Sequence, residues 1–363
     1  MKLIFACGRE ISYPRNRLIF QSLSHFATVY PLFSNHPALF HRLSVTTFRL
    51  LKTITPHLDA YFIGFFGQPL VFPTRVRWKG PLILDAFVSA YDTLCFDRKT
   101  FSPNSPLGVM TFHLDRLSCH LSDVIIVDTR AQAKYFQHTF QLPEFKFQVV
   151  YAGCDDDLFR PLEVSPSEIP TVLFYGTFLP LHGVDVIIQA AYQLRHEHLL
   201  FKIIGRGQEY EKARSLASKL RVHNVQFLPP VPLEDLPLII NRATICLGGP
   251  FGRSNKAQRV ITSKTFQCLS AGKPTIVGET PANKELFTHG KNVWMCPAGD
   301  AEALADAIQI LLDSPDLCVQ LGKAGREIIQ QTSGKVVTAQ LVRNAVEKAL
   351  CFHRERSRSN SDL

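Results

Sequence analysis

Short apolar runs alternate with longer amphipathic segments along the whole chain. The runs predict six strands in the first half, at Leu3–Cys7, Thr28–Leu32, Ala60–Gly64, Leu82–Asp85, Val124–Asp128 and Phe147–Tyr151. They predict six more in the second half, at 171–175, Phe201–Ile204, Val225–Phe227, Ile245–Leu247, Thr275–Gly278 and Val293–Cys296. Strands that alternate with helices form parallel sheets. The pattern therefore predicts two doubly wound, Rossmann-like α/β domains.

The segments between the strands have the period of amphipathic helices. Those that we interpret as helices include Pro14–Leu23, Arg130–Phe140, Val184–Leu194, Gln208–Lys219, Leu233–Asn241, Ala301–Leu312 and Leu317–Gln330. The stretch FRPLEVSPSEIP breaks the pattern, which places the first domain at 1–165 and the second at 166–335. A last amphipathic segment, 336–352, is long enough to return to the first domain, and we expect the serine-rich tail, 353–363, to be disordered.

Composition excludes several classes of protein. The chain has 363 residues, of which 46% are hydrophobic and 20% charged, so it can bury large cores and is neither disordered nor fibrous. A net charge of +9 suits an anionic partner. The surplus is spread over both halves, and the one cluster of cations, Arg354–Arg358, lies in the tail. We therefore expect no nucleic-acid partner.

Cysteines and apolar runs bear on the location of the protein. The nine cysteines are widely spaced and include no C-x-x-C pair, which favours buried reduced thiols in a cytoplasmic protein over a zinc site. After Lys2 the apolar run is too short for a signal peptide. The run 60–72 is too short to span a bilayer, which needs roughly 20 apolar residues. We interpret it as a buried strand and the following loop, rather than a segment that dips into a membrane.

Polar residues follow two strands of the first half, where ligands bind in open α/β sheets. After the first strand, GREISYPRNR offers Arg9, Arg15 and Arg17 before a helix, and Arg9 with the helix amides could hold a phosphate. The alternative is a surface pair of Arg9 with Glu10. After the fourth strand, Asp85 could accept hydrogen bonds from sugar hydroxyls or take a proton, or it could cap a helix. Behind it stand Ser89, Tyr91, Asp92, Asp97 and Arg98.

The second half carries glycines and cations after its strands. Gly176 and the pair His182-Gly183 frame a turn before a helix, which can present amides to an anion, although His182 could equally be structural. The stretch IIGRGQEYEKA has Gly205-x-Gly207 but Tyr210 in place of a third glycine, so it does not indicate a dehydrogenase. A glycine-rich loop then carries three flexible cations, Lys256, Arg259 and Lys264. Such cations suit a diphosphate, and the alternative is that the segment is a solvated loop.

Five segments in order make the chain resemble glycosyltransferase family 4, the retaining nucleotide-sugar-dependent transferases of GT-B fold. They are VVYAGCDDDLFRP, VLFYGTFLPLHGVDVIIQAA, FKIIGRGQEYEKARSLA, CLSAGKPTIVGETPANKELFTHGKN and DAEALADAIQILLDSPDLCVQLGKAGRE. The likeness covers nearly the whole chain. It departs from the family where the Glu-x7-Glu pair falls on Arg259 and Gln267. Thr177 stands where the family often has an Arg, and His182 where it often has a Lys.

The resemblance implies a function and a set of roles. A glycosyl group would pass from a nucleotide diphosphate sugar, held by the second domain, to an acceptor hydroxyl on the first, across a cleft and without a metal or other cofactor. The nucleotide-sugar site would include Gly176, Thr177, His182, Gly183, Gly205, Lys256, Arg259, Lys264 and Gln267, the last contacting the ribose. Asp85 and Arg9 would be catalytic, and Ser89, Tyr91, Asp92 and Arg98 would bind the acceptor.

Three matters stay open at this point. The acceptor would be a glycan or a lipid-linked molecule, with peripheral contact to the inner face of the membrane as an option. A sugar-nucleotide epimerase, a glycan phosphorylase or a non-catalytic nucleotide-sugar-binding protein could share the fold. The sugar, the base of the donor and the oligomeric state are not defined by the residues.

Overall fold

A computed structural model describes residues 1–363 except 54–56, 166 and 362–363, with side chains described up to Arg356. It divides into two compact units. The first comprises Met1–Tyr151 and Lys335–Leu363, and the second comprises Ala152–Gly334. The change of unit thus comes at Tyr151, before the proline-rich stretch in which the sequence placed the boundary. Pro166, at that expected boundary, lies outside the described residues.

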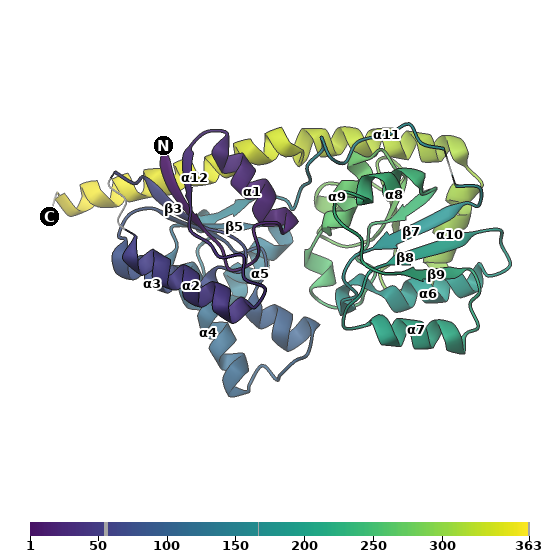
Figure 1. The fold of residues 1–363 in the computed structure, drawn as a ribbon, viewed down its shortest axis with the longest axis horizontal. Helices are drawn as coiled ribbons and strands as arrows, with labels where there is room; N and C mark the ends of the chain where they lie inside the picture. Colours follow the sequence, from purple (N-terminus) through teal and green to yellow (C-terminus); the bar gives the residue numbers. More distant parts are fainter. Residues whose placement is uncertain (54–56, 166, 362–363) are drawn as a thin grey trace. The chain divides into compact units, whose positions relative to one another are not determined.

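The first unit contains one six-stranded parallel sheet (Figure 1). The strands are β1 (Lys2–Ala6), β2 (Thr28–Pro31), β3 (Ala60–Ile63), β4 (Leu82–Asp85), β5 (Val124–Val127) and β6 (Phe147–Val149), in the order β2-β1-β3-β4-β5-β6. The helices are α1 (Pro14–Ser24), α2 (Leu39–Lys52), α3 (Gln68–Arg77), α4 (Pro106–Leu121), α5 (Arg130–Phe140) and α12 (Lys335–Ser361). A π-helical turn, Asp92–Asp97, follows β4.

Alternate residues of each strand in this sheet enter different cores. Leu3 and Phe5 of β1 pack in one cluster with α1 and α12, whereas Ile4 and Ala6 pack in another with α2, α3, α4 and α5. The sheet therefore has helices on both faces, as its continuous apolar strands require. The run 60–72 is buried as β3 and α3, which confirms its interpretation as part of the interior, but the loop after β3 is short because helix begins again at Gln68.

The second unit repeats this architecture. Its strands are β7 (Thr171–Tyr175), β8 (Leu200–Ile204), β9 (Val225–Leu228), β10 (Ile245–Leu247), β11 (Thr275–Gly278) and β12 (Trp294–Cys296), in the parallel order β12-β11-β10-β7-β8-β9. Its helices are α6 (Val184–Gln193), α7 (Tyr210–Lys219), α8 (Leu236–Arg242), α9 (Ser263–Ser270), α10 (Ala301–Leu312) and α11 (Pro315–Thr332). Both expected doubly wound sheets are present.

The C-terminal segment returns to the first unit, where α12 lies beside α1 (Figure 1). Val342, Ala345 and Val346 of α12 are completely buried against the first sheet. The helix continues to Ser361, over most of the segment 353–363 that the sequence analysis expected to be disordered. Arg and Glu are good helix formers, and the Arg356 guanidinium pairs with Asp123 of the same unit at 2.8 Å.

The remaining sequence expectations on location concern cysteines and membrane spans. All nine cysteines are free, and seven of them are buried, as expected for thiols in a core. Among the described residues, no helix combines the length and the apolar character needed to cross a bilayer.

Candidate functional site

The second sheet reverses its direction of growth between β7 and β10. From β7 the chain proceeds through β8 to β9, and then returns to place β10 on the other side of β7. Such a switch point leaves a crevice at the carboxyl ends of the two central strands, where open α/β sheets bind ligands. The turn that begins at Gly176 follows β7, and the loop that begins at Gly248 follows β10. Most predicted donor residues come from these segments and from α9, which follows the second of them, and Gly205 follows β8.

Glycines at the ends of β7 and β8 let the two backbone segments approach each other closely. Gly176 has φ +138° and Gly205 has φ +134°, both outside the range that other residues adopt readily. A Cβ atom on Gly205 would lie 2.0 Å from the Gly176 carbonyl oxygen, so only glycine fits there. The Gly176 N–H donates to the Ile204 carbonyl at 3.0 Å. The ends of β7 and β8 are thereby held together beside the crevice.

Lys264 is the main cation beside this turn. Its side chain is only 5% exposed, and a Cβ on Gly176 would lie 3.4 Å from Lys264 Cε. The ammonium lies 5.0 Å from the centre of the Phe174 ring, but within the described residues it has no carboxylate or hydrogen-bond acceptor. Burial lowers the pKa of Lys264 from 10.5 to about 7, against a smaller opposing effect of Cys268. A buried cation without a counter-charge is poised to receive an anion.

His182 and Lys256 lie close to this lysine. Burial lowers the pKa of His182 well below its usual value, and the charges of Lys264 and Lys256 lower it further. The imidazole is therefore neutral near pH 7, and its Nδ1 lies 2.5 Å from the Thr177 carbonyl oxygen, to which it donates. His182 thus closes the turn, with Nε2 left as an acceptor. The positive charge at this point comes from Lys264 and from Lys256, which is 6% exposed.

Gln267 is positioned by a tyrosine that the sequence analysis did not single out. The Tyr175 hydroxyl, at the end of β7, donates to Gln267 Oε1 at 2.7 Å, and both side chains are buried. Within the described part of the chain, Gln267 Nε2 keeps its hydrogens for another acceptor. The position of Tyr175 directly before Gly176 is the signal that could have identified it. Its hydroxyl fixes the amide of Gln267, which lies on α9 three residues after Lys264.

The remaining predicted donor residues differ in exposure. Gly183, at φ +63°, packs so tightly on Phe251 and Gly252 that a Cβ would lie 2.5 Å from the Phe251 carbonyl carbon. Thr177 is exposed, and Arg259 is partly exposed at the end of a short 3-10 turn, Ala257–Arg259. The structure therefore brings Gly176, Gly205, His182, Lys256, Lys264 and Gln267 together around the turn after β7.

In the first unit, Asp85 is completely buried in an ion pair. Its two carboxylate oxygens accept hydrogen bonds from Arg15 Nε at 2.9 Å and Nη2 at 3.0 Å. Arg15 Nη1 also donates to the carbonyls of Val150 and Tyr151. This bidentate pair ties the end of β4 to α1 and to the chain segment after β6. It gives Asp85 a structural partner that neither the catalytic nor the helix-capping interpretation included.

The other first-unit candidates separate into buried and exposed residues. Ser89 is buried and donates to Asp115 Oδ2 at 2.6 Å, while the Asp92 N–H donates to the Ser89 hydroxyl. Burial raises the pKa of Asp115 to about 6. Tyr91 is partly buried, and Arg98 is exposed. The Ser89 hydroxyl therefore serves the interior of this unit, because it donates to the buried carboxylate of Asp115 and accepts from the Asp92 N–H.

Arg9 follows β1 at the switch point of the first sheet and pairs with Glu10 at 2.9 Å. The surface pair considered from the sequence is thus present. Glu10 is shared with the buried Arg42, at 2.7 Å, so its charge is already partly balanced. Arg9 remains about half exposed and keeps donors on its outer side.

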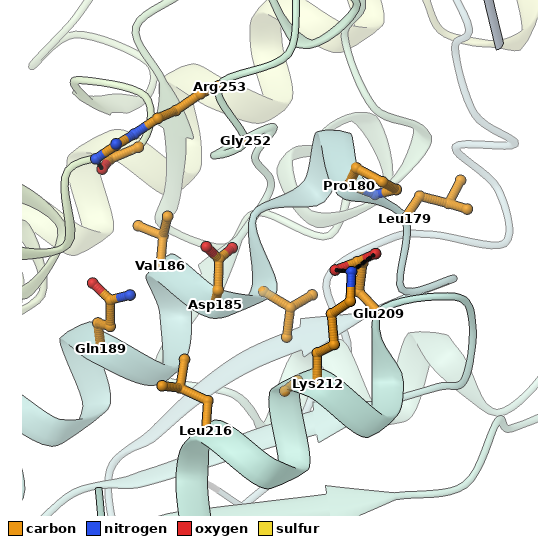
Figure 2. A pocket seen from close by; sticks show the side chains of 13 residues that line it. Leu179, Pro180, Asp185, Val186, Gln189, Glu209, Lys212, Leu216, Gly252 and Arg253 are labelled. Atoms are coloured by element: carbon orange, nitrogen blue, oxygen red, sulfur yellow. Dashed lines mark hydrogen bonds and ion pairs between the residues drawn. The ribbon is translucent and has the colours of Figure 1, made fainter. Parts of the chain in front are cut away.

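A pocket of about 540 Å³ opens beside α6 and α7 (Figure 2). Asp185, Glu209, Lys212 and Arg253 bring both signs of charge to its walls, and Lys212 is paired with Glu209 at 3.0 Å. None of the predicted donor residues lines it. The candidate donor residues at the switch point therefore lie outside this pocket.

Comparisons with known proteins agree with this fold. Sucrose-phosphate synthase from Thermosynechococcus elongatus superposes with a TM-score of 0.78 at 14% identity, over 97% of this chain and all of that one. Anabaena HepE, solved with UDP, superposes with a TM-score of 0.72 at 15% identity, over 96% of this chain and all of that one. These likenesses define the class: two Rossmann-like α/β units with the GT-B glycosyltransferase fold.

Sequence comparison is more specific for the second unit. Residues 155–328 match the family described as glycosyl transferases group 1. A phosphatidyl-myo-inositol mannosyltransferase of Mycobacterium leprae is 28% identical over 176 residues, covering 48% of this chain and 45% of the relative. A GDP-mannose-dependent alpha-(1-6)-phosphatidylinositol monomannoside mannosyltransferase of Mycobacterium tuberculosis is 26% identical over 201 residues, covering 51% of each. The chain spans about half the length of these curated relatives.

Proposed function

We propose that the protein is a retaining glycosyltransferase that uses a nucleotide diphosphate sugar. In the reaction, the bond between the anomeric carbon and the diphosphate oxygen breaks, and a bond from that carbon to an acceptor oxygen forms. The acceptor hydroxyl loses its proton, and the nucleoside diphosphate leaves. The site must therefore stabilise the charge that develops on the departing diphosphate.

The observation that carries this proposal is the buried ammonium of Lys264 at the switch point of the second sheet. A cation that is 5% exposed and lacks a counter-charge among the described residues costs folding free energy unless an anion completes it. Lys256 adds a second charge nearby. In the family that this chain resembles, cations often occupy the positions of Thr177 and His182. Lys264 and Lys256, which come from a different segment, would supply that positive charge here.

Gln267 supports the nucleoside part of the site. With Oε1 held by Tyr175, its Nε2 can donate to a ribose hydroxyl, which a carboxylate at this position could not do. The donor would thus lie with its diphosphate beside Lys264 and its ribose beside α9. Because lysines supply the charge, we propose that the reaction needs no metal and survives a chelator. The free cysteines suit a reducing compartment, so we also propose a cytoplasmic location.

The names of the relatives narrow the donors that should be tested first. The mycobacterial relative is named as dependent on GDP-mannose, and HepE was solved with UDP-glucose. The experiment incubates the purified chain with GDP-mannose and UDP-glucose, each with a panel of glycan and inositol-lipid acceptors. Release of nucleoside diphosphate and the glycosylated product are measured together, and NMR of the product reports the anomeric configuration.

Matched lysine variants make the test specific. Lys264→Met should lower turnover at least about tenfold, whereas Lys212→Met, an exposed lysine of the same unit, should leave it unchanged. Stabilisation by nucleotides without product from any acceptor would instead favour the non-catalytic binding protein. Equal activity of Lys264→Met and the original protein would remove the proposed role of this lysine.

A further inference from the structure

Helices α2, α3 and α4 form adjacent members of one helical layer on the first sheet. Each packs against the next, and their buried side chains enter the same core. Their other sides form the outer surface of the layer, which we call the α2–α4 face. Ten of the nineteen exposed large apolar side chains in the described residues belong to these three helices. The most exposed of them are Phe40, Val76, Phe48, Met110, Leu107 and Leu117.

Helix α2 buries Leu50 in the core but turns other apolar side chains outward. It buries Arg42 and Thr46, whereas Phe40 is 84% exposed and Phe48 is 58% exposed. Phe40, Phe48 and Leu51 stand at positions i, i+8 and i+11, so they form one stripe. An exposed phenylalanine forgoes the hydrophobic free energy that its burial would give. The stripe therefore points to a partner that covers it.

The charges around this stripe are all positive. Neither α2 nor α3 contains Asp or Glu, and the single acidic residue of α4, Asp115, is completely buried. Exposed cations stand at the C-terminal ends of α2 and α3, among them Arg49, Lys52 and Arg77. Lys52 Nζ lies 4.2 Å from the centre of the Phe48 ring, so cation and ring face the same side.

We propose that the α2–α4 face docks on an anionic lipid bilayer. Aromatic and aliphatic side chains flanked by cations, without exposed carboxylates, are the composition of surfaces that lie in the interface of a membrane. Phe40 and Phe48 would enter the boundary between headgroups and acyl chains, while Lys52 and Arg77 contact lipid phosphates. The absence of exposed acid from these helices favours the anionic bilayer over a second copy of this chain, which would bring equal positive charge to the contact.

The test is sedimentation of the full chain with vesicles of phosphatidylcholine, alone or mixed with phosphatidylglycerol. We expect binding to the anionic vesicles that weakens as salt is added. Phe40→Ser combined with Phe48→Ser should reduce partitioning about tenfold or more. Lys52→Glu combined with Arg77→Glu should abolish the preference for phosphatidylglycerol. Circular dichroism checks that each variant is folded.

Two exposed valines on other helices, one in α11 and one in α12, provide the matched control. Val319→Ser combined with Val336→Ser removes side chains that are 71% and 83% exposed, and should leave vesicle binding unchanged. Equal loss in this control, or no binding of the original chain to anionic vesicles, would overturn the proposal. So would a dimer, seen by light scattering, that only the phenylalanine variant dissociates. Vesicle binding requires neither donor nor acceptor, so its failure is distinct from failure of the proposed transfer.

Discussion

The buried lysine beside the Gly176 turn leads to a prediction about pH. With a pKa of about 7 in the folded chain and 10.5 as the ordinary value, Lys264 binds its proton less tightly when folded. The unfolded chain therefore holds more protons between these two values, and stability rises with pH across this window. At about 1.4 kcal/mol for each pKa unit, the charged lysine costs the fold about 4 kcal/mol at pH 7.

Lys264→Met keeps an unbranched side chain and removes the free-energy cost of burying the ammonium group. We expect the free energy of unfolding of the variant to exceed that of the original protein by up to about 4 kcal/mol near pH 7. The difference should shrink as the pH approaches 10.5, the ordinary pKa of lysine. Urea unfolding at several pH values measures it, and Lys212→Met, which alters an exposed lysine of the same unit, should show no such difference.

Binding of a nucleoside diphosphate should take up a proton at Lys264, whereas folding releases one. An anion beside Lys264 favours its charged form, so binding above pH 7 must take up about one proton, and the affinity should fall by up to tenfold per pH unit. Calorimetry between about pH 7.5 and 9 in two buffers of different ionisation enthalpy counts that proton, since phosphate is fully ionised there. His182 stays neutral in this range, and burial keeps the pKa of Tyr175 far above it. A flat affinity with no proton uptake would refute the reasoning.

Other predictions concern single contacts. Asp85→Asn leaves Arg15 buried without a full counter-charge and should cost about 3–5 kcal/mol in urea unfolding. Unchanged turnover per folded molecule would make the aspartate structural, whereas lost turnover at full stability would support its catalytic role. Tyr175→Phe releases Gln267 and should cost about 1–3 kcal/mol. It should weaken binding of a nucleoside diphosphate more than that of inorganic pyrophosphate, and equal weakening of both would contradict the ribose contact. Arg356→Ala should cost less than about 1 kcal/mol, because its guanidinium is largely exposed. A larger loss on thermal unfolding would mean that this pair anchors α12.

The strands could be predicted because their signal is local. Runs such as Leu82–Asp85 and Thr275–Gly278 are apolar on both faces, and the structure gives them the expected bounds. Helix α2 gave no such signal. Its buried side combines Leu50 with Arg42 and Thr46, while phenylalanines face outward, so polar and apolar residues are mixed on both sides.

The candidate site could be predicted only in part. Glycines and cations after strands pointed to the turn at Gly176 and to Lys264, and the structure brings them together. The partners of Asp85 and Gln267 could not be read from local spacing, because Arg15 lies 70 positions away and Tyr175 lies 92. Such pairs depend on which loops share an edge of a sheet, and that order is a property of the whole topology.

The return of α12 to the first unit has a consequence for the order in which the chain can fold. Val342, Ala345 and Val346 cover the same face of the first sheet as α1, yet they are synthesised after all of the second unit. During synthesis, part of that face of the N-terminal sheet must therefore stay uncovered while residues 152–334 emerge and become able to fold. Completion of the first unit is the last event, and a chain that stops before Lys335 would leave an apolar surface open to aggregation.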